Sequence, residues 1–286
     1  MFGKRKDGRQ VHEVEPFQKI VPYIMKTRTD SMNMFEEALV CEPIDKYISE
    51  KKSEGISVSY MSVVIAAMVR VIAMRPQLNR FVVRGKIYTR PKIWVSFVVH
   101  PTLRDDSAGT TIKLAFEGTE TILEINEKIN EAIAKEQNKS KEKNSTDKLA
   151  ATIMSLPGFL IRSAVNFLIF LDKHNALPKA VIEASPFHTT FFITNMKSLG
   201  INAIYHHVYE FGTTGIFFAL GKEKKVPVVD DDDNIVIGKR AGLNVVTDER
   251  FCDGLYFARA FRLLKKMLAN PWILENELDK KTEDCK

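Results

Sequence analysis

Hydrophobic and polar positions follow two different periods along the chain. Short apolar runs bounded by turn residues predict strands at 34–41, 81–84, 86–90, 93–99, 189–195, 215–220, 226–229, 235–237 and 243–248. Longer segments with helical spacing are predicted at 43–52, 58–74, 119–137, 153–171 and 254–268. There is no internal repeat and no convincing domain boundary, so we expect one domain over 1–286.

Three polar tracts separate these segments. Residues 1–30 are basic and irregular, 138–148 are lysine-rich and predict an exposed loop, and 230–234 read Asp-Asp-Asp-Asp-Asn. Four consecutive aspartates suggest calcium binding, but the surrounding residues do not have the ligand spacing of a calcium-binding loop. A solvated hairpin turn is therefore the favoured interpretation of 230–234.

The segment 153–171 is strongly apolar, which raises the question whether it contacts a membrane. Pro157, Arg162 and Asn166 interrupt it, and a membrane-spanning helix tolerates a central arginine poorly. We favour a helix that is buried or lies in an oligomer interface. A helix on a membrane surface stays open as the alternative, together with the basic N-terminus.

The composition bears on the kind of ligand that the protein binds and on its location in the cell. The net charge is +6 over 286 residues, which is mild and suits an anionic small molecule as well as nucleic acid. Cys41, Cys252 and Cys285 form no CxxC pair and no metal spacing, and no apolar run follows the first six residues. We expect a reducing, cytoplasmic location and no resident metal.

The most informative stretch is Thr247-Asp-Glu-Arg-Phe-Cys-Asp-Gly254, at the end of a predicted strand and before a helix. It resembles the His-x-x-x-Asp-Gly motif of chloramphenicol acetyltransferase and of the catalytic domain of the 2-oxoacid dehydrogenase acyltransferases, with Glu249 at the histidine position. Three further places resemble the same family: Pro76-Gln-Leu-Asn79 after a long apolar helix, Phe192-Ile-Thr-Asn195, and the segment that begins with Arg28.

The resemblance implies an α/β fold, the chloramphenicol acetyltransferase-like two-layer sandwich with helices against a mixed β-sheet. It also implies a homotrimer with the site between subunits, and acyl transfer from or to coenzyme A by direct attack. By position, Thr194 would stabilise the oxyanion, Asp253 and Arg28 would form a structural pair, and Glu249 would occupy the place of the base. The expected partner is an acyl-CoA, with no nucleic acid. Either a separate lipoyl protein or a small molecule would be the acceptor, since no lipoyl or peripheral-subunit-binding domain is recognised in the sequence.

Glu249 leaves three interpretations open. An ordinary glutamate, with a pKa of ~4.3, is a weak base for a thiol whose pKa is near 8.5, unless burial raises it. A histidine from elsewhere is the second possibility, and His206 and His207, flanked by tyrosines, are the candidates. The third is a catalytically silent homologue that binds a ligand or acts as a scaffold. A His-His metal site lacks a third ligand at suitable spacing. His188 has no evident context.

Overall fold

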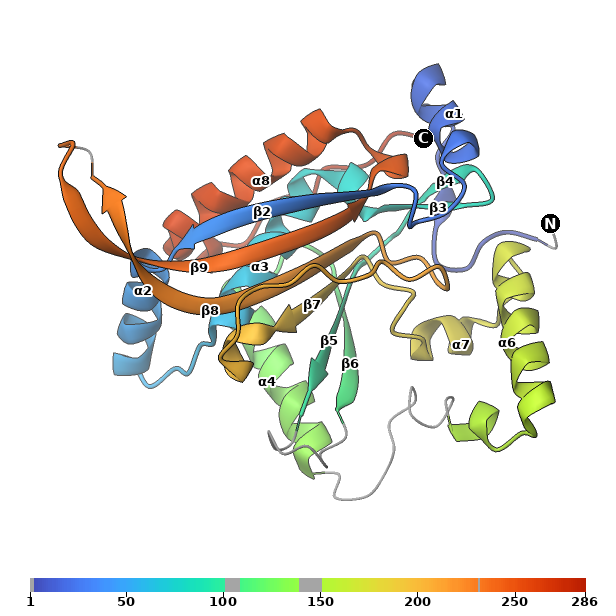
Figure 1. Ribbon diagram of the computed structural model, residues 1–286, viewed down its shortest axis with the longest axis horizontal. Coiled ribbons are helices and arrows are strands. Elements are labelled where there is room, and N and C mark those ends of the chain that lie inside the picture. The colour runs from blue at the N-terminus through green and yellow to red at the C-terminus, as the bar shows by residue number, and fades with distance from the viewer. Residues whose placement is uncertain (1–2, 101–108, 139–150, 231) are drawn as a thin grey trace.

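The computed structural model describes residues 3–100, 109–138, 151–230 and 232–286 (Figure 1). Its centre is a six-stranded sheet in the order β2-β9-β8-β7-β5-β6. The pairs β5–β7 and β7–β8 are parallel and the others are antiparallel. The strands are β2 (Met32–Val40), β5 (Ile93–Val99), β6 (Thr110–Phe116), β7 (Phe191–Asn195), β8 (Ile216–Val229) and β9 (Ile235–Asp248).

A second, smaller sheet has the order β1-β4-β3. Its strands are β1 (Arg9–Gln10), β3 (Arg80–Val83) and β4 (Lys86–Thr89), and both pairings are antiparallel. The C-terminal residues bind this sheet: Arg80 of β3 forms a bidentate pair with Asp284 at 2.7 and 2.6 Å, and Arg9 of β1 donates to the main-chain oxygens of Cys285 and Asp284.

The helices lie mainly on one face of the large sheet (Figure 1). They are α1 (Pro16–Ile24), α2 (Glu42–Ser53), α3 (Tyr60–Met74), α4 (Ile122–Asn138), α6 (Gly158–Lys173), α7 (Lys179–Ala184) and α8 (Gly254–Ala269), and the short 3-10 turns are η1 (Pro76–Asn79), η2 (Met196–Leu199), η3 (Glu249–Phe251) and η4 (Pro271–Glu275). The two-layer arrangement of helices against a mixed sheet that the sequence predicts is confirmed.

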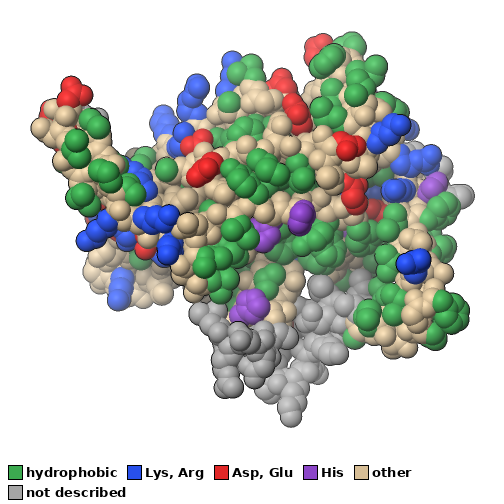
Figure 2. Space-filling model, in the orientation of Figure 1, with side chains coloured by type: hydrophobic (Ala, Val, Ile, Leu, Met, Phe, Trp, Pro, Cys, Tyr) green, Lys and Arg blue, Asp and Glu red, His purple; other side chains and the backbone are tan. Residues whose placement is uncertain are grey.

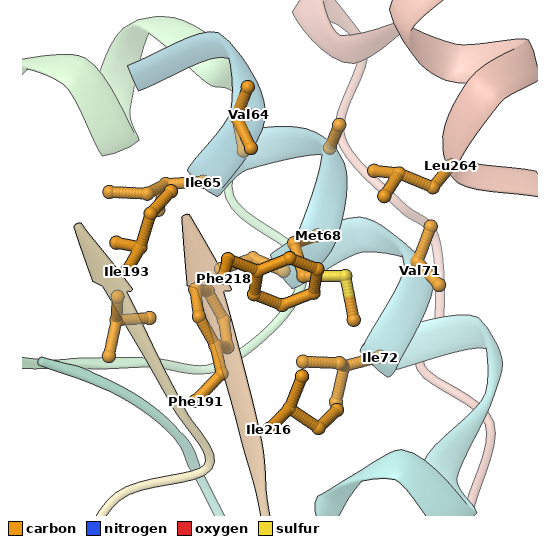
Figure 3. Packing of buried hydrophobic residues seen from close by; sticks show 14 of the residues in the cluster. Val64, Ile65, Met68, Val71, Ile72, Phe191, Ile193, Ile216, Phe218 and Leu264 are labelled. Carbon is orange, nitrogen blue, oxygen red and sulfur yellow. The ribbon is translucent and has the colours of Figure 1, made fainter. Parts of the chain in front are cut away.

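The core forms around α3. Ser59 caps this helix by accepting a hydrogen bond from the main-chain N–H of Ser62 at 3.0 Å, and every residue from Tyr60 to Ala73 is buried. Figure 3 shows α3 side chains such as Met68 packed against Phe191 and Phe218 of the sheet. Because α3 is apolar on all sides, it requires the sheet on one side and other helices on the other.

On the opposite face of the large sheet, the described residues form no layer of helices (Figure 1), and we call it the open face. Strand alternation assigns the residues: Phe191 and Ile193 point into the main core, whereas Phe192 packs in a separate small cluster with Phe217. Residues 200–215, the covering segment, lie on this face. Gly221 permits the contact, because a Cβ atom there would lie 2.3 Å from the main-chain nitrogen of Ala203.

Several local predictions are confirmed and others are incomplete. Strands β8 and β9 form a hairpin in which Val229 pairs with Ile235, and the Asp230 carboxylate accepts hydrogen bonds from the N–H groups of Asp232 and Asn234, while Asp231 of the predicted turn lies outside the described residues. The sequence analysis missed α1, α7 and β6. The predicted loop at 138–148 lies, beyond residue 138, outside the described residues.

The apolar segment is a helix but is not buried by the described part of the chain. Within α6 only Asp172 is buried, whereas Phe159 is 75% exposed and Phe167 is 59% exposed. Burial within the described part of the chain is therefore contradicted, and the position of this helix in an oligomer interface stays a prediction. Among the described residues, no helix has the length and hydropathy needed to cross a membrane.

Candidate active site

The signature stretch forms the junction between β9 and α8. Strand β9 ends at Asp248, η3 follows at once, and α8 begins at Gly254. Asp253 caps α8, because its Oδ1 accepts a hydrogen bond from the N–H of Tyr256 at 2.7 Å. The side chain of Cys252 is buried, and burial raises the pKa of its thiol well above the ordinary value. Cys252 therefore packs in the core and is unsuited to act as a nucleophile.

Asp248 organises this junction. Its carboxylate is 1% exposed and accepts hydrogen bonds from Arg250 Nε at 2.8 Å, Arg250 Nη2 at 2.7 Å and Ser31 Oγ at 3.0 Å. Burial acts to lower the pKa of Arg250, but the hydrogen bonds and the charge of Asp248 outweigh it, so the pKa of Arg250 is raised. The sequence analysis missed Asp248 and Arg250, although two charged residues at the end of an apolar strand were a usable signal.

Arg28 faces Asp248 and not Asp253. Its Nε lies 3.8 Å from Asp248 Oδ2, and its Nη1 donates to the main-chain oxygen of Glu210 at 2.8 Å. Burial lowers the pKa of Arg28, and the Asp248 charge opposes this in part. The predicted Arg28–Asp253 pair is corrected accordingly. Asp253 lies beyond the strand end with its carboxylate exposed, whereas Asp248 is the last strand residue and points into the junction.

Glu249 lies next to this network but takes no part in it. Its N–H donates to the main-chain oxygen of Ser31 at 2.9 Å, and its side chain is half-buried. Within the part of the chain that the structure describes, its carboxylate has no hydrogen bond or ion pair. Glu249 is thus a fixed main-chain position with a side chain available to another molecule.

Thr194 lies on the open face but far from Glu249 of the same chain. It is half-buried near the end of β7 and pairs with Ala219 of β8, which in turn pairs with Asn244 of β9. Glu249 follows Asn244 by five residues, so the two sites are separated by roughly 16 Å along the strands and about 10 Å across them. A single substrate carbonyl cannot contact both residues within one chain.

His206 is closer to Thr194. Its ring stacks on Phe217, with ring centroids 4.4 Å apart, and Thr194 is diagonal to Phe217 on the neighbouring strand, at a Cα separation of roughly 8 Å from the strand spacings. The Nε2 of His206 is buried without a hydrogen-bond partner among the described residues. Burial, and then the proximity of His207, lowers the pKa of His206, so the ring is neutral at neutral pH. His207 is exposed.

A second polar cluster joins residues from distant parts of the sequence. His188 Nδ1 lies 2.8 Å from Ser185 Oγ, and its Nε2 lies 3.2 Å from Asp172 Oδ1, while Arg5 Nη2 binds the same Asp172 oxygen at 2.8 Å. Burial acts to raise the pKa of Asp172, but His188 and Arg5 lower it to about 2. All four residues are buried, so we assign this cluster to the attachment of α6. Among the described residues, no group of three possible metal ligands is close enough to hold a metal ion.

Comparison with known proteins identifies the architecture. Residues 184–275, which include Thr194, His206 and the β9–α8 junction, match the family model for the catalytic domain of 2-oxoacid dehydrogenase acyltransferases. A search of curated protein sequences gives no significant match. The chain has the chloramphenicol acetyltransferase-like fold. The family model over residues 184–275 confirms the resemblance inferred from the sequence, and the solved structures show the fold over most of the chain.

Solved structures support this fold at low sequence identity. A probable dihydrolipoamide acetyltransferase from Listeria monocytogenes 4b F2365 superposes with a TM-score of 0.57 at 16% identity, covering 90% of this chain and 93% of the other. The dihydrolipoamide acetyltransferase of Azotobacter vinelandii gives 0.59 at 13% identity, covering 93% and 94%. A chloramphenicol acetyltransferase gives 0.56 at 9% identity, covering 91% and 99%.

Proposed function

We propose that the protein transfers an acyl group from or to coenzyme A on the open face of its large sheet. The observation that carries the proposal is that this face holds a neutral imidazole, His206, stacked on Phe217, and that Thr194 is diagonal to Phe217 on the neighbouring strand. A base and a hydrogen-bond donor near one carbonyl are the two groups that direct acyl transfer requires.

In this mechanism the imidazole of His206 accepts the proton of the acceptor thiol or hydroxyl. The acceptor sulfur or oxygen then bonds to the thioester carbonyl carbon, and the Thr194 hydroxyl donates to the resulting oxyanion. When the tetrahedral intermediate collapses, the carbon–sulfur bond to coenzyme A breaks and the proton returns to the leaving thiolate. A hydrogen bond to the oxyanion contributes about 3–4 kcal/mol of transition-state stabilisation in comparable sites.

Glu249 is the alternative base, supplied by a neighbouring subunit. Thr194 and Glu249 are too far apart within one chain, and the resemblance implies a homotrimer with the site between subunits. The acceptor is then a separate lipoyl protein, free coenzyme A or a small molecule. The names of the Listeria and Azotobacter neighbours favour a dihydrolipoamide acceptor.

A catalytically silent homologue that binds a ligand or serves as a scaffold is the second candidate function. The observation that favours it is the replacement of the motif histidine by Glu249, whose carboxylate has no partner to hold it in place among the described residues. Such a protein would keep the fold and the Asp248 network without turnover.

The test combines binding and turnover on matched variants. Acetyl-CoA binding is measured by calorimetry, and acetyl transfer to dihydrolipoamide is followed in the same samples for the wild type, His206→Gln, Glu249→Gln and His207→Gln. We expect His206→Gln to reduce kcat by ~10²–10⁴-fold with binding retained, and the exposed His207→Gln to match the wild type. Loss in Glu249→Gln alone would assign the base to Glu249, and binding without turnover in the wild type would establish the silent homologue.

The pH dependence provides an independent criterion. Because burial lowers the pKa of His206 below its ordinary value of 6.5, a His206-dependent rate should rise with pH below 6.5 and be constant around pH 7 with respect to this group. A rising limb with a midpoint above 6.5 would contradict the role of His206.

A further inference from the structure

Helix α6 presents an aromatic surface that the described part of the chain does not cover. Phe159, Phe167 and Phe170 are 75%, 59% and 46% exposed, and we call them the phenylalanine face. At 3.6 residues per turn, the three side chains fall within an arc of roughly 80°. Asp172 is opposite this arc and is the one buried residue of the helix. Figure 2 shows hydrophobic side chains over the region that α6 occupies in Figure 1.

Basic side chains border the phenylalanine face. Arg162 and Lys173 are exposed and lie on one side of it, roughly 40–60° from Phe159 around the helix axis. Exposed Lys4 and Lys6 flank Arg5, which donates to the main-chain oxygen of Asp172 at 2.8 Å and so holds the basic N-terminal segment at the end of α6.

Negative charge near this surface is neutralised. Asp172 is the single acidic residue between 151 and 173, and it is buried against Arg5. Asp7 also pairs with Arg5, at 2.6 Å, and Glu183 pairs with Lys179 at 3.5 Å. The surface therefore combines exposed aromatic rings with a border of positive charge.

We propose that α6 docks this protein on an anionic lipid surface, with the phenylalanine face inserted at the headgroup boundary and the basic residues facing the lipid phosphates. Helices that lie in a membrane interface combine apolar side chains with a Lys- or Arg-rich border in this way, and each basic residue near an anionic surface adds attraction. An antiparallel two-fold contact between two copies through the same face would instead place Arg162 and Lys173 of both copies on the same flank, and like charges oppose that arrangement.

The test is co-sedimentation of the full chain with vesicles that contain about 30 mol% phosphatidylserine, compared with pure phosphatidylcholine vesicles. The phenylalanine face is removed by combining Phe159→Ser, Phe167→Ser and Phe170→Ser. The matched control combines Ile235→Ser and Ile237→Ser on the β8–β9 hairpin, where the two side chains are 77% and 71% exposed. Circular dichroism and gel filtration compare the folding and the oligomeric state of the variants.

The proposal expects wild type and hairpin control to bind the anionic vesicles equally, with binding weakened at about 0.5 M salt. The phenylalanine variant should lose binding by at least ~10-fold while it remains folded. Absence of wild-type binding would overturn the proposal, as would full binding by the phenylalanine variant. If the wild type binds no vesicles and the phenylalanine variant changes its oligomeric state, the face is an interface between copies and the proposal is equally overturned.

Discussion

Asp248 and Asp253 lie five positions apart, and the structure predicts that their replacement by asparagine has very different effects. Asp248→Asn removes the charge that two buried guanidinium groups face, those of Arg28 and Arg250. Removal of one partner of a buried ion pair costs about 3–5 kcal/mol, because the remaining charge stays buried without compensation. Asp253→Asn should change the stability by less than about 0.5 kcal/mol, because asparagine caps a helix nearly as well as aspartate.

Both values are measured by denaturant unfolding and by differential scanning calorimetry at neutral pH. At about 2 °C per kcal/mol for a chain of this length, Asp248→Asn should lower the melting temperature by ~6–10 °C. Arg28→Met tests the pair in a double-mutant cycle, in which a coupling energy with Asp248→Asn and none with Asp253→Asn is expected. The reasoning is refuted if Asp253→Asn is the more destabilising change, or if Arg28 couples to Asp253.

Three further predictions concern other parts of the molecule. Burial lowers the pKa of His188 below its ordinary value of 6.5, so below pH 6.5 the unfolded chain binds more protons than the folded chain. The free energy of unfolding should therefore fall as the pH drops below 6.5, and His188→Gln should flatten this dependence in unfolding measurements. Burial lowers the pKa of Lys113 to about 7, so a larger fraction of its amine is uncharged and reactive near neutral pH. Acetic anhydride should therefore label Lys113 faster than the half-exposed Lys265, as measured by mass spectrometry, and equal rates would contradict this. Gly221→Ala should destabilise by about 1–3 kcal/mol because its Cβ would lie 2.3 Å from the covering segment, whereas Gly254→Ala, with no atom within 4 Å, should not clash, and denaturant unfolding compares the two.

Local patterns predicted much of the fold. The helical stripe at 122–133, the all-apolar run of α3 and the turn residues around 230–234 each specify one element whatever the rest of the chain does. The strand β6 was missed, although Ile112, Leu114 and Phe116 occupy alternate positions, because β6 and its partner β5 are not joined by a tight hairpin turn.

The arrangement of the candidate site could be predicted less completely from the sequence. Whether Asp248 or Asp253 faces Arg28 depends on where β9 ends. The ends of helices and strands are the features that a sequence pattern predicts least accurately. Arg5 and Asp172 come together across 167 positions, and His188 joins them, a separation that no local spacing reveals. The exposure of α6 contradicts only its burial within the chain. An apolar run indicates that a helix needs a covering surface, but it does not indicate whether the same chain or another molecule supplies that surface.

The central claim is that the open face carries out acyl transfer with His206 as the base. The measurement that tests it most directly is acetyl transfer from acetyl-CoA to dihydrolipoamide by the wild type, His206→Gln and His207→Gln, with acetyl-CoA binding measured on the same samples. We expect turnover by the wild type and by His207→Gln, and binding with little turnover by His206→Gln. Acetyl-CoA binding without turnover in the wild type, or full activity in His206→Gln, would contradict it.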